Sequence, residues 1–236
     1  MSFWLGWLVC YILPFITAGV FFGGLAYRVI RWWRSPRALV SLVVPPERRS
    51  VGQTVRQIST EIVAFRRVFR GSKAFWAMTW PFHFSILVFI LGHFRLFIDF
   101  TWLWNVLRLT PEQVDPLAFV GGGVAGTVFM LGVLALLVRR FMMPVRSLSV
   151  PGDYLLLLLL LALAVSGNYM RFFMRIELAQ YRAFFSDLFH FRLAEPLDNW
   201  FFVLHFLLVQ ILLTYFPFSK LVHVIGGVLT LKWTLR

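Results

Sequence analysis

The sequence predicts an all-α integral membrane protein with five transmembrane helices, and three observations support this prediction. Hydrophobic residues make up 60% of the 236 positions and charged residues only 14%, well below the roughly 25% charged residues of soluble domains. Five apolar stretches approach the roughly 20 residues that a helix needs to cross a bilayer. The positive charges are concentrated in the segments between these stretches.

The five expected spans form one membrane domain over residues 1–236, which suits the length of the chain. The fourth span contains an unbroken leucine run, Leu155 to Leu161. The stretches are too long and too uniformly apolar for barrel strands, so we expect helices. The spans cover approximately residues 3–27, 80–104, 116–138, 154–170 and 200–217.

The distribution of charge predicts the orientation of these helices. Segment 28–79 carries eleven Lys and Arg residues against two acidic ones, and both segment 139–153 and the C-terminal tail are also basic. Segments 105–115 and 171–199 are near balance. The positive-inside rule therefore places the N-terminus outside and the C-terminus in the cytoplasm. The net charge of +13 then reflects orientation in the cytoplasmic membrane, not binding to nucleic acid.

The basic cytoplasmic segment 28–79 contains an amphipathic pattern. Apolar residues at 55, 58, 62, 65 and 69 fall on one helical face, with arginines on the others. A helix lying on the anionic inner leaflet would show this pattern. A docking surface for a cytoplasmic partner would show it too, and the two interpretations are compatible.

Four of the five histidines lie in or just beyond two expected spans, and ionisable residues at membrane depth are costly and therefore functional candidates. His83 and His93 are ten residues apart in the second span, or about 15 Å along a helix. His205 and His223 are 18 residues apart, which is five helical turns if the fifth helix continues past Pro217. His190 lies in an outer connection and is expected to be interfacial.

The second and fifth helices are antiparallel, and this matches the histidines by depth. His83 and His223 are expected near the cytoplasmic face, and His93 and His205 toward the outer face. Each pair can fill both axial positions of a haem iron, which leaves one-electron transfer as its chemistry. The alternative is that the histidines bond neighbouring helices or belong to a proton relay.

Two glycine positions bear on this prediction. Gly92 precedes His93 and would let a macrocycle approach the helix closely. A second patch, with glycines at 121, 122, 123 and 126, fits either haem clearance or close helix packing.

At these residues the chain resembles the gamma subunit of respiratory nitrate reductase. It also resembles relatives of that subunit in heterodisulfide-reductase-like and sulfite-reduction-associated (Dsr) membrane complexes. The matching stretches run from Leu204 to His223, from Phe119 to Arg140, and over Gly92-His93-Phe94. The resemblance implies that the four histidines ligate two haems b. The sequence from Phe69 to His83 and the long basic segment look more like the Dsr and heterodisulfide-reductase-like branch, which implies a role in sulfur metabolism.

The resemblance implies an electron-transfer subunit of an oxidoreductase that exchanges electrons between menaquinol or menaquinone and a cytoplasmic iron–sulfur subunit. Cys10, the single cysteine, cannot provide the ligands of a cluster, so any cluster belongs to another subunit. Other membrane or periplasmic subunits of a respiratory complex are also expected. The direction of electron flow is left open.

One departure from the family concerns the quinol site. The nitrate reductase gamma subunit has a lysine near the outer haem, whereas this chain has none between Lys73 and Lys220, and Gln113 is nearest that position. Charged residues at this edge, including Arg95, Asp99 and Asp115, are expected to be ordinary interfacial groups.

Two alternative functions remain. One is the gamma subunit of a respiratory nitrate reductase. The other, from a different class, is a haem-free transporter or membrane scaffold that carries histidines. A transporter would be expected to pair acidic and basic residues at mid-membrane, and these are scarce here.

Overall fold

A computed structural model describes residues 3–34, 50–174, 177–192 and 197–227, and no residue in these ranges lies in a β-strand. Within the described residues, five helices are long and apolar enough to cross a membrane. The chain is therefore an all-α, multi-pass membrane protein, as predicted. The five helices cover Trp4–Arg34, Lys73–Leu96, Pro111–Phe141, Pro151–Met174 and Trp200–Phe218.

The chain divides into two compact units, which are described separately. Unit 1 comprises Met1–Phe15 and Pro81–Gln210, and unit 2 comprises Ile16–Trp80 and Ile211–Arg236. The boundaries fall within long helices: α2 (Leu13–Arg34), α6 (Lys73–His93) and α11 (Trp200–Tyr215).

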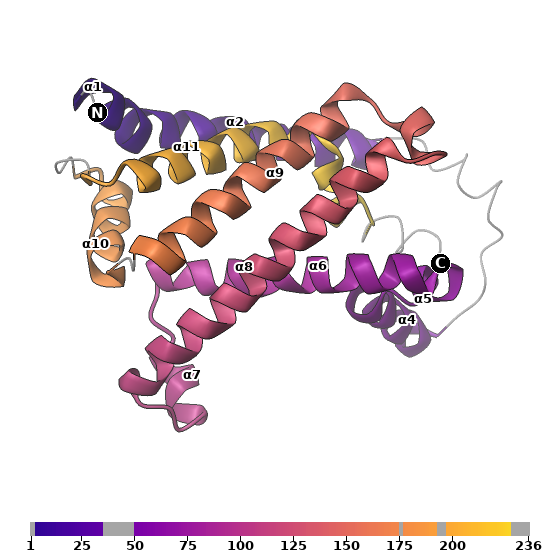
Figure 1. Cartoon of the computed structure of the whole chain (residues 1–236), viewed down its shortest axis with the longest axis horizontal. Coiled ribbons are helices and arrows are strands. Elements are labelled where there is room, and N and C mark those ends of the chain that lie inside the picture. Colours follow the sequence, from indigo (N-terminus) through magenta and orange to yellow (C-terminus); the bar gives the residue numbers. More distant parts are fainter. Residues whose placement is uncertain (1–2, 35–49, 175–176, 193–196, 228–236) are drawn as a thin grey trace. The chain divides into compact units, whose positions relative to one another are not determined.

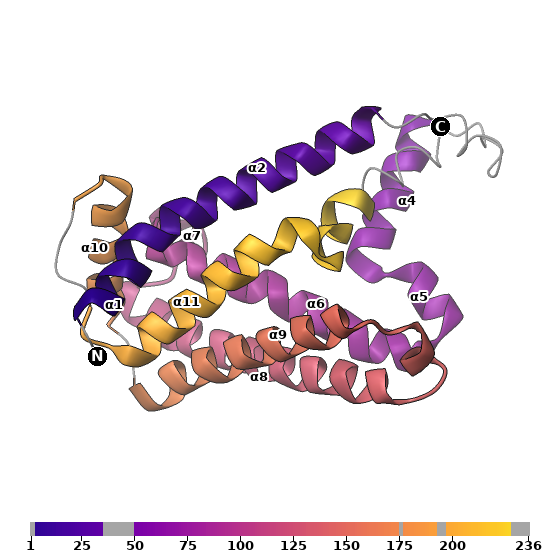
Figure 2. The same cartoon turned by 90° about the horizontal axis from the view of Figure 1, so that it is seen from above.

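In unit 1, α8 (Pro111–Phe141) and α9 (Pro151–Tyr169) run antiparallel and side by side (Figures 1 and 2). A turn that includes η3 (Val145–Leu148) joins them. Gly132 allows α8 to approach α6, because a Cβ at this position would lie 2.9 Å from the Phe82 ring. Small residues at helix contacts permit this close packing in lipid. The buried side chains of this cluster belong to Phe82, Phe129, Val133, Leu157 and Ala164.

A further helix of unit 1, α10 (Leu178–Phe189), lies in the segment that sequence analysis treated only as an outer connection. Its buried residues Tyr181, Phe184, Phe185 and Leu188 recur at the spacing of one helical face. They pack against the N-terminal residues 9–11 and against the start of α11 at Phe202 and Val203. The N-terminal residues belong to a π-helical turn, η1 (Leu8–Ile12), which follows α1 (Phe3–Trp7).

The second span was predicted at residues 80–104, but the membrane helix covers Lys73–Leu96. The prediction therefore lay too far toward the C-terminus. α6 begins at Lys73, where the Ser72 hydroxyl accepts from the Phe75 N–H, and it ends at His93. A 3₁₀ turn, η2 (Phe94–Leu96), follows, and a separate short helix, α7, covers Thr101–Val106. The apolar composition of residues 97–104 resembles a membrane span, but the chain leaves the helix there.

In unit 2, the fifth membrane helix does not continue to His223. α11 ends at Tyr215, and two 3₁₀ turns, η5 (Phe216–Phe218) and η6 (Lys220–Val222), precede helical residues 223–227. Pro217 lacks an N–H donor and therefore interrupts the helical hydrogen bonds. The expectation that His205 and His223 share a face through five continuous turns is wrong for this reason.

Over the amphipathic stretch at residues 55–70, the structure has two helices where the sequence predicted one continuous face. α4 (Val51–Ala64) and α5 (Arg66–Gly71) are separated at Phe65, whose φ of 49° is left-handed. The apolar face expected from residue 55 to residue 69 is therefore interrupted. The indole N–H groups of Trp76 and Trp80 donate to the carbonyls of Ala64 and Val63, each at 2.8 Å, so two α6 tryptophans satisfy the exposed C-terminal carbonyls of α4.

Candidate functional site

The imidazole of His93 is held in one tautomer by its own helix. Its Nδ1 lies 2.6 Å from the Phe89 carbonyl oxygen, one turn earlier. A carbonyl oxygen can only accept, so Nδ1 carries the proton and Nε2 keeps a lone pair. The side chain is exposed. This is the protonation state of a histidine that binds a metal through Nε2.

His205 has the same arrangement, but its partner comes from another helix. The Ser166 hydroxyl on α9 donates to the Ala162 carbonyl at 2.8 Å. Its oxygen is then available to accept from Nδ1 of His205, also at 2.8 Å. Nε2 of His205 is therefore left with its lone pair.

Gly167 provides the space for this contact. A Cβ at Gly167 would lie 3.2 Å from Cε1 and 3.7 Å from Nδ1 of His205. Both distances are below or near ordinary van der Waals contact, so a larger residue would displace the imidazole. The α9 backbone and the Ser166 hydroxyl together determine the position of this ring.

His93 and His205 both belong to unit 1, where the Phe185 ring lies 5.1 Å from that of Phe97 after His93 and 5.6 Å from that of Phe206 next to His205. Among the described residues, no group of three or more His, Cys, Asp or Glu side chains could hold a metal ion. Haem needs only two axial ligands, because the porphyrin supplies the equatorial donors. Two neighbouring histidines with Nδ1–H donated and Nε2 unprotonated have the donor chemistry for that role.

The other two predicted ligands fall in different units. His83 lies in unit 1, where its ring meets Phe82 edge to face with centroids 5.1 Å apart. His223 lies in unit 2, and its Nδ1 is 2.9 Å from the Lys220 carbonyl oxygen. His223 thus repeats the Nδ1–carbonyl contact of His93, and its pairing with His83 stays a prediction.

His190, which sequence analysis left out of the ligand set, terminates α10 at the surface. It is exposed, and its Nδ1 bonds to the Ser186 carbonyl at 2.7 Å.

Sequence analysis gave the glycines two possible roles, clearance for a haem and close helix packing, and different glycines fit each role. A Cβ on Gly92 or Gly121 would meet no described atom within 4 Å, so these positions leave open space. The other glycines of the second patch are in close contact with the end of α9. A Cβ on any of them would press on a side chain from that segment, which makes helix packing their role. The contacts are Gly122 with Arg171, Gly123 with Phe172 and Gly126 with Asn168.

Arg171 places a positive charge at the end of the fourth membrane helix. It lies in a π-helical turn, η4 (Met170–Met174), that continues α9. Its Nη1 donates to the carbonyls of Ala118 and Phe119 on α8, each at 3.1 Å. No ion pair to Arg171 occurs within the described part of the chain. A cation fixed by neutral carbonyls keeps its charge available to a ligand.

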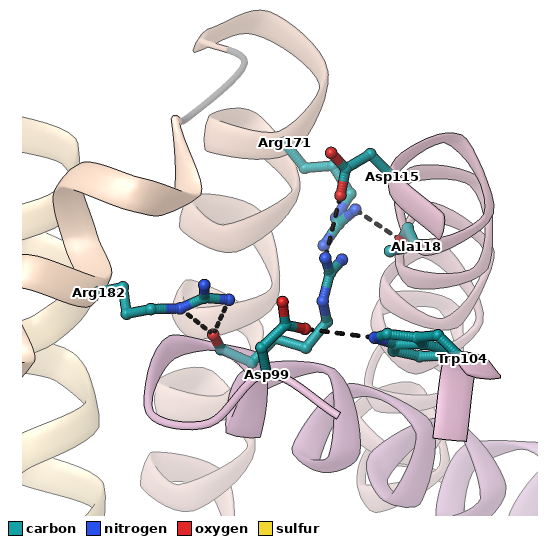
Figure 3. A network of polar contacts seen from close by, with 7 residues as sticks. Asp99, Trp104, Asp115, Ala118, Arg171 and Arg182 are labelled. Carbon is teal, nitrogen blue, oxygen red and sulfur yellow. Dashed lines mark hydrogen bonds and ion pairs between the residues drawn. The ribbon is translucent and has the colours of Figure 1, made fainter. Parts of the chain in front are cut away.

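The remaining polar residues at this edge have structural partners (Figure 3). Gln113 accepts from the Thr110 backbone N–H at 3.0 Å in a capping box that begins α8. Asp99 accepts from the Trp104 indole at 3.2 Å, and Arg95 pairs with Asp115 at 3.0 Å. These groups bond to one another and to helix ends, Gln113 serves as part of a helix cap, and their interfacial placement stays a prediction.

Sequence reasoning missed Ser166, Gly167 and Arg171. Ser166 and Gly167 contact a histidine that lies 39 and 38 residues further along the chain, and no local pattern predicts such a contact. Arg171 gave a usable signal, because it is an arginine directly after the predicted fourth span. A charge at the end of an apolar run is common, however, so sequence analysis counted it only among the charges of the outer connection.

Comparison with known proteins identifies the family of this chain. The family model described as the nitrate reductase gamma subunit matches residues 48–234. Two similar proteins are each named Hdr-like menaquinol oxidoreductase cytochrome b-like subunit. The one from Archaeoglobus fulgidus is 27% identical and the one from Archaeoglobus profundus 29%, over 92% of this chain and 76% of each relative.

A third relative comes from the nitrate reductases themselves. The respiratory nitrate reductase 1 gamma chain of Escherichia coli is 30% identical over 61% of this chain and 68% of its own length. The family match covers four of the five membrane helices and all four candidate ligands. The chain therefore belongs to the nitrate reductase gamma subunit family.

Proposed function

We propose that this chain is a dihaem cytochrome b subunit that transfers electrons between menaquinol and a cytoplasmic iron–sulfur subunit of a respiratory complex. The observation that carries the proposal is the pair His93 and His205. Both histidines bond through Nδ1 within the protein, to the Phe89 carbonyl at 2.6 Å and to the Ser166 hydroxyl at 2.8 Å, and both lie in unit 1. Each can therefore offer Nε2 to one iron.

When bound, haem supplies a reversible one-electron change at iron. His93 and His205 would hold the outer haem through Nε2, and a haem held by two histidines would serve electron transfer. His83 and His223 would do the same for the inner haem, which rests on their matched depth in the sequence and on the family. The N-terminus would lie outside and the C-terminus in the cytoplasm, on the positive-inside rule.

Arg171 would help to bind the quinol near the outer pair. Its guanidinium is fixed by two α8 carbonyls at the end of the fourth membrane helix. A fixed cation favours an oxygen that becomes more negative as it loses a proton. This residue would take the place of the lysine that the chain lacks. Replacing Arg171 with Gln is expected to raise the KM for a menaquinol analogue more than it changes haem content.

The names of the Archaeoglobus relatives support an Hdr-like complex and menaquinol as the quinol; the Dsr alternative rests on the resemblance in the sequence alone. We propose that the basic residues of α4 and α5 face the cytoplasmic partner, where positive charge would steer an acidic surface. A link to sulfur metabolism would follow from that branch of the family.

A nitrate reductase gamma subunit is the second candidate, favoured by the Escherichia coli relative. The two candidates differ in the partner that co-purifies with the tagged chain from native membranes. A heterodisulfide-reductase-like iron–sulfur subunit would support the first, and a nitrate-reducing subunit the second.

The test of the proposal is a reduced-minus-oxidised absorption spectrum of the purified chain, together with haem extraction. We expect b-type bands and two haems per chain. A protein with no b-type bands and no extractable haem would support the transporter or scaffold alternative and overturn the proposal. Menaquinol-dependent reduction of the bands would extend the test to the substrate.

A further inference from the structure

His93 occupies an exposed position in its helix. It is the last residue of α6, and the chain tightens into the 3₁₀ turn η2 directly after it. Helix ends fray, because their last carbonyls lack partners in the helix. The orientation of the His93 imidazole therefore depends on what holds the turn that follows.

Arg95 holds that turn in two ways (Figure 3). Its backbone carbonyl accepts from Arg182, and its own side chain pairs with Asp115. Arg182 on α10 donates through Nε and Nη2 to the Arg95 carbonyl oxygen, at 3.1 and 3.0 Å. The Arg95 side chain extends to α8, where it pairs with Asp115 at 3.0 Å and lies 5.9 Å from the Trp104 ring. One residue is thus bonded to two helices, two positions after His93.

Apolar contacts reinforce the contact with α10. The Phe97 ring lies 5.1 Å from that of Phe185 and 5.5 Å from that of Phe189, centroid to centroid. Aromatic pairs at these distances add to the gain from burial alone. The turn after His93 is therefore packed on α10 as well as bonded to it.

The same helix also contacts the element that carries His205. Phe185 of α10 lies 5.6 Å from Phe206, the neighbour of His205, and Tyr181 lies 4.7 Å from Phe202. The Asn199 side chain, just before α11, donates to the Tyr181 hydroxyl at 2.7 Å. A single amphipathic helix thus touches the end of α6 and the start of α11.

We infer that α10 positions His93 relative to His205, and that Arg182 is the positioning residue through which it acts on His93. This inference rests on the proposed function, because it concerns a haem held by these two histidines. Arg182 does not contact the haem in this account. It fixes the backbone that carries one ligand, while the aromatic face of α10 fixes the helix that carries the other.

The test compares two variants that loosen this arrangement with a matched control. Arg182→Gln removes the forked donor and one positive charge. Phe97→Ala removes packing and changes no charge. Arg192→Gln removes the same charge from an exposed arginine of the same connection, whose side chain makes no hydrogen bond or ion pair among the described residues. Full-length proteins are purified and their haem content is measured first.

Two readouts separate positioning from general destabilisation. The low-spin ferric haem signals in electron paramagnetic resonance report the orientation of the axial imidazoles. Haem transfer to excess apomyoglobin reports retention of each haem. We expect Arg182→Gln to shift or broaden one of two signals and to release one haem about tenfold faster, the size expected for a lost charge-assisted hydrogen bond. Phe97→Ala should act in the same direction, and Arg192→Gln should match the wild type.

Three results would overturn the inference. The first is that Arg182→Gln matches Arg192→Gln in both readouts. The second is that Phe97→Ala leaves both resonance signals unchanged. The third is that Arg182→Gln loses both haems together. A wild-type protein without haem would instead refute the proposed function, so the two failures are distinguishable.

Discussion

The hydrogen bond from His205 to Ser166 gives the sharpest prediction. Ser166→Ala removes the oxygen that accepts from Nδ1 of His205 at 2.8 Å, and leaves that N–H without its partner. Ser166 is only 6% exposed, so water does not readily replace the lost acceptor. An unsatisfied buried donor costs about 1–3 kcal/mol, or roughly 5- to 140-fold in an equilibrium constant.

The expected effect is at the lower part of that range, because the partner is a neutral hydroxyl and His205 is half-buried. Loss of a partner that orients a metal-binding histidine typically costs 10- to 100-fold in affinity. We therefore expect about tenfold weaker retention of one haem. The midpoint potential of that haem should rise, because an imidazole that no longer donates from Nδ1 is a weaker base and stabilises ferric iron less.

The assay is haem transfer to apomyoglobin combined with a redox titration of the b-type bands. Ser85→Ala is the matched control, because Ser85 is 2% exposed and its hydroxyl also bonds a carbonyl of its own helix, that of Phe82 at 2.7 Å. If Ser166→Ala and Ser85→Ala release haem at the same rate and have the same potentials, the role assigned to Ser166 is refuted.

Three further predictions concern the same unit. Gly167→Ala would place a methyl group 3.2 Å from Cε1 of His205, so we expect reduced occupancy of one haem, measured as haem per protein; full occupancy would show that the ring has room to move. Arg140→Gln leaves the Asp153 carboxylate, which is 5% exposed, without its 3.3 Å partner. It should lower stability by about 2 kcal/mol, less than the roughly 3–5 kcal/mol of a fully buried pair because Arg140 is partly exposed. A thermal melt in detergent would measure this, and an unchanged melting temperature with an unchanged haem spectrum would contradict it. Cys10 is fully buried, so a maleimide should label it only after denaturation, and rapid labelling of the native protein would show that the core around α10 is open.

The sequence predicted the five spans because long apolar runs are a strong signal, but it misplaced the ends of the second one. Residues 97–104 are apolar enough to resemble a span, and only the backbone shows that α6 stops at His93. The α10 face was visible as Tyr181, Phe184, Phe185 and Leu188 at helical spacing. This helix has only 12 residues and an amphipathic pattern, so it lacks the length and continuous apolarity by which spans are recognised.

The candidate ligands could be proposed from the sequence, whereas the residues that contact them could not. Histidines in apolar runs stand out by type, and their depth follows from span order. Ser166, Gly167 and Arg182 act across 39, 38 and 87 residues respectively, so their roles depend on packing that no local pattern encodes. The expected alignment of His205 with His223 failed because it assumed a continuous helix, whereas Pro217 ends the regular hydrogen bonding before η6.

The central claim is that His93 and His205 hold one haem together and that a second haem is held elsewhere. Haem stoichiometry of His93→Ala, His205→Ala and the double variant tests it most directly. Two haems per chain in the wild type should fall to one in each single variant and stay at one in the double variant, because both substitutions remove the same haem. A double variant that loses both haems, while each single variant loses one, would show that the two histidines serve different haems and would contradict the account.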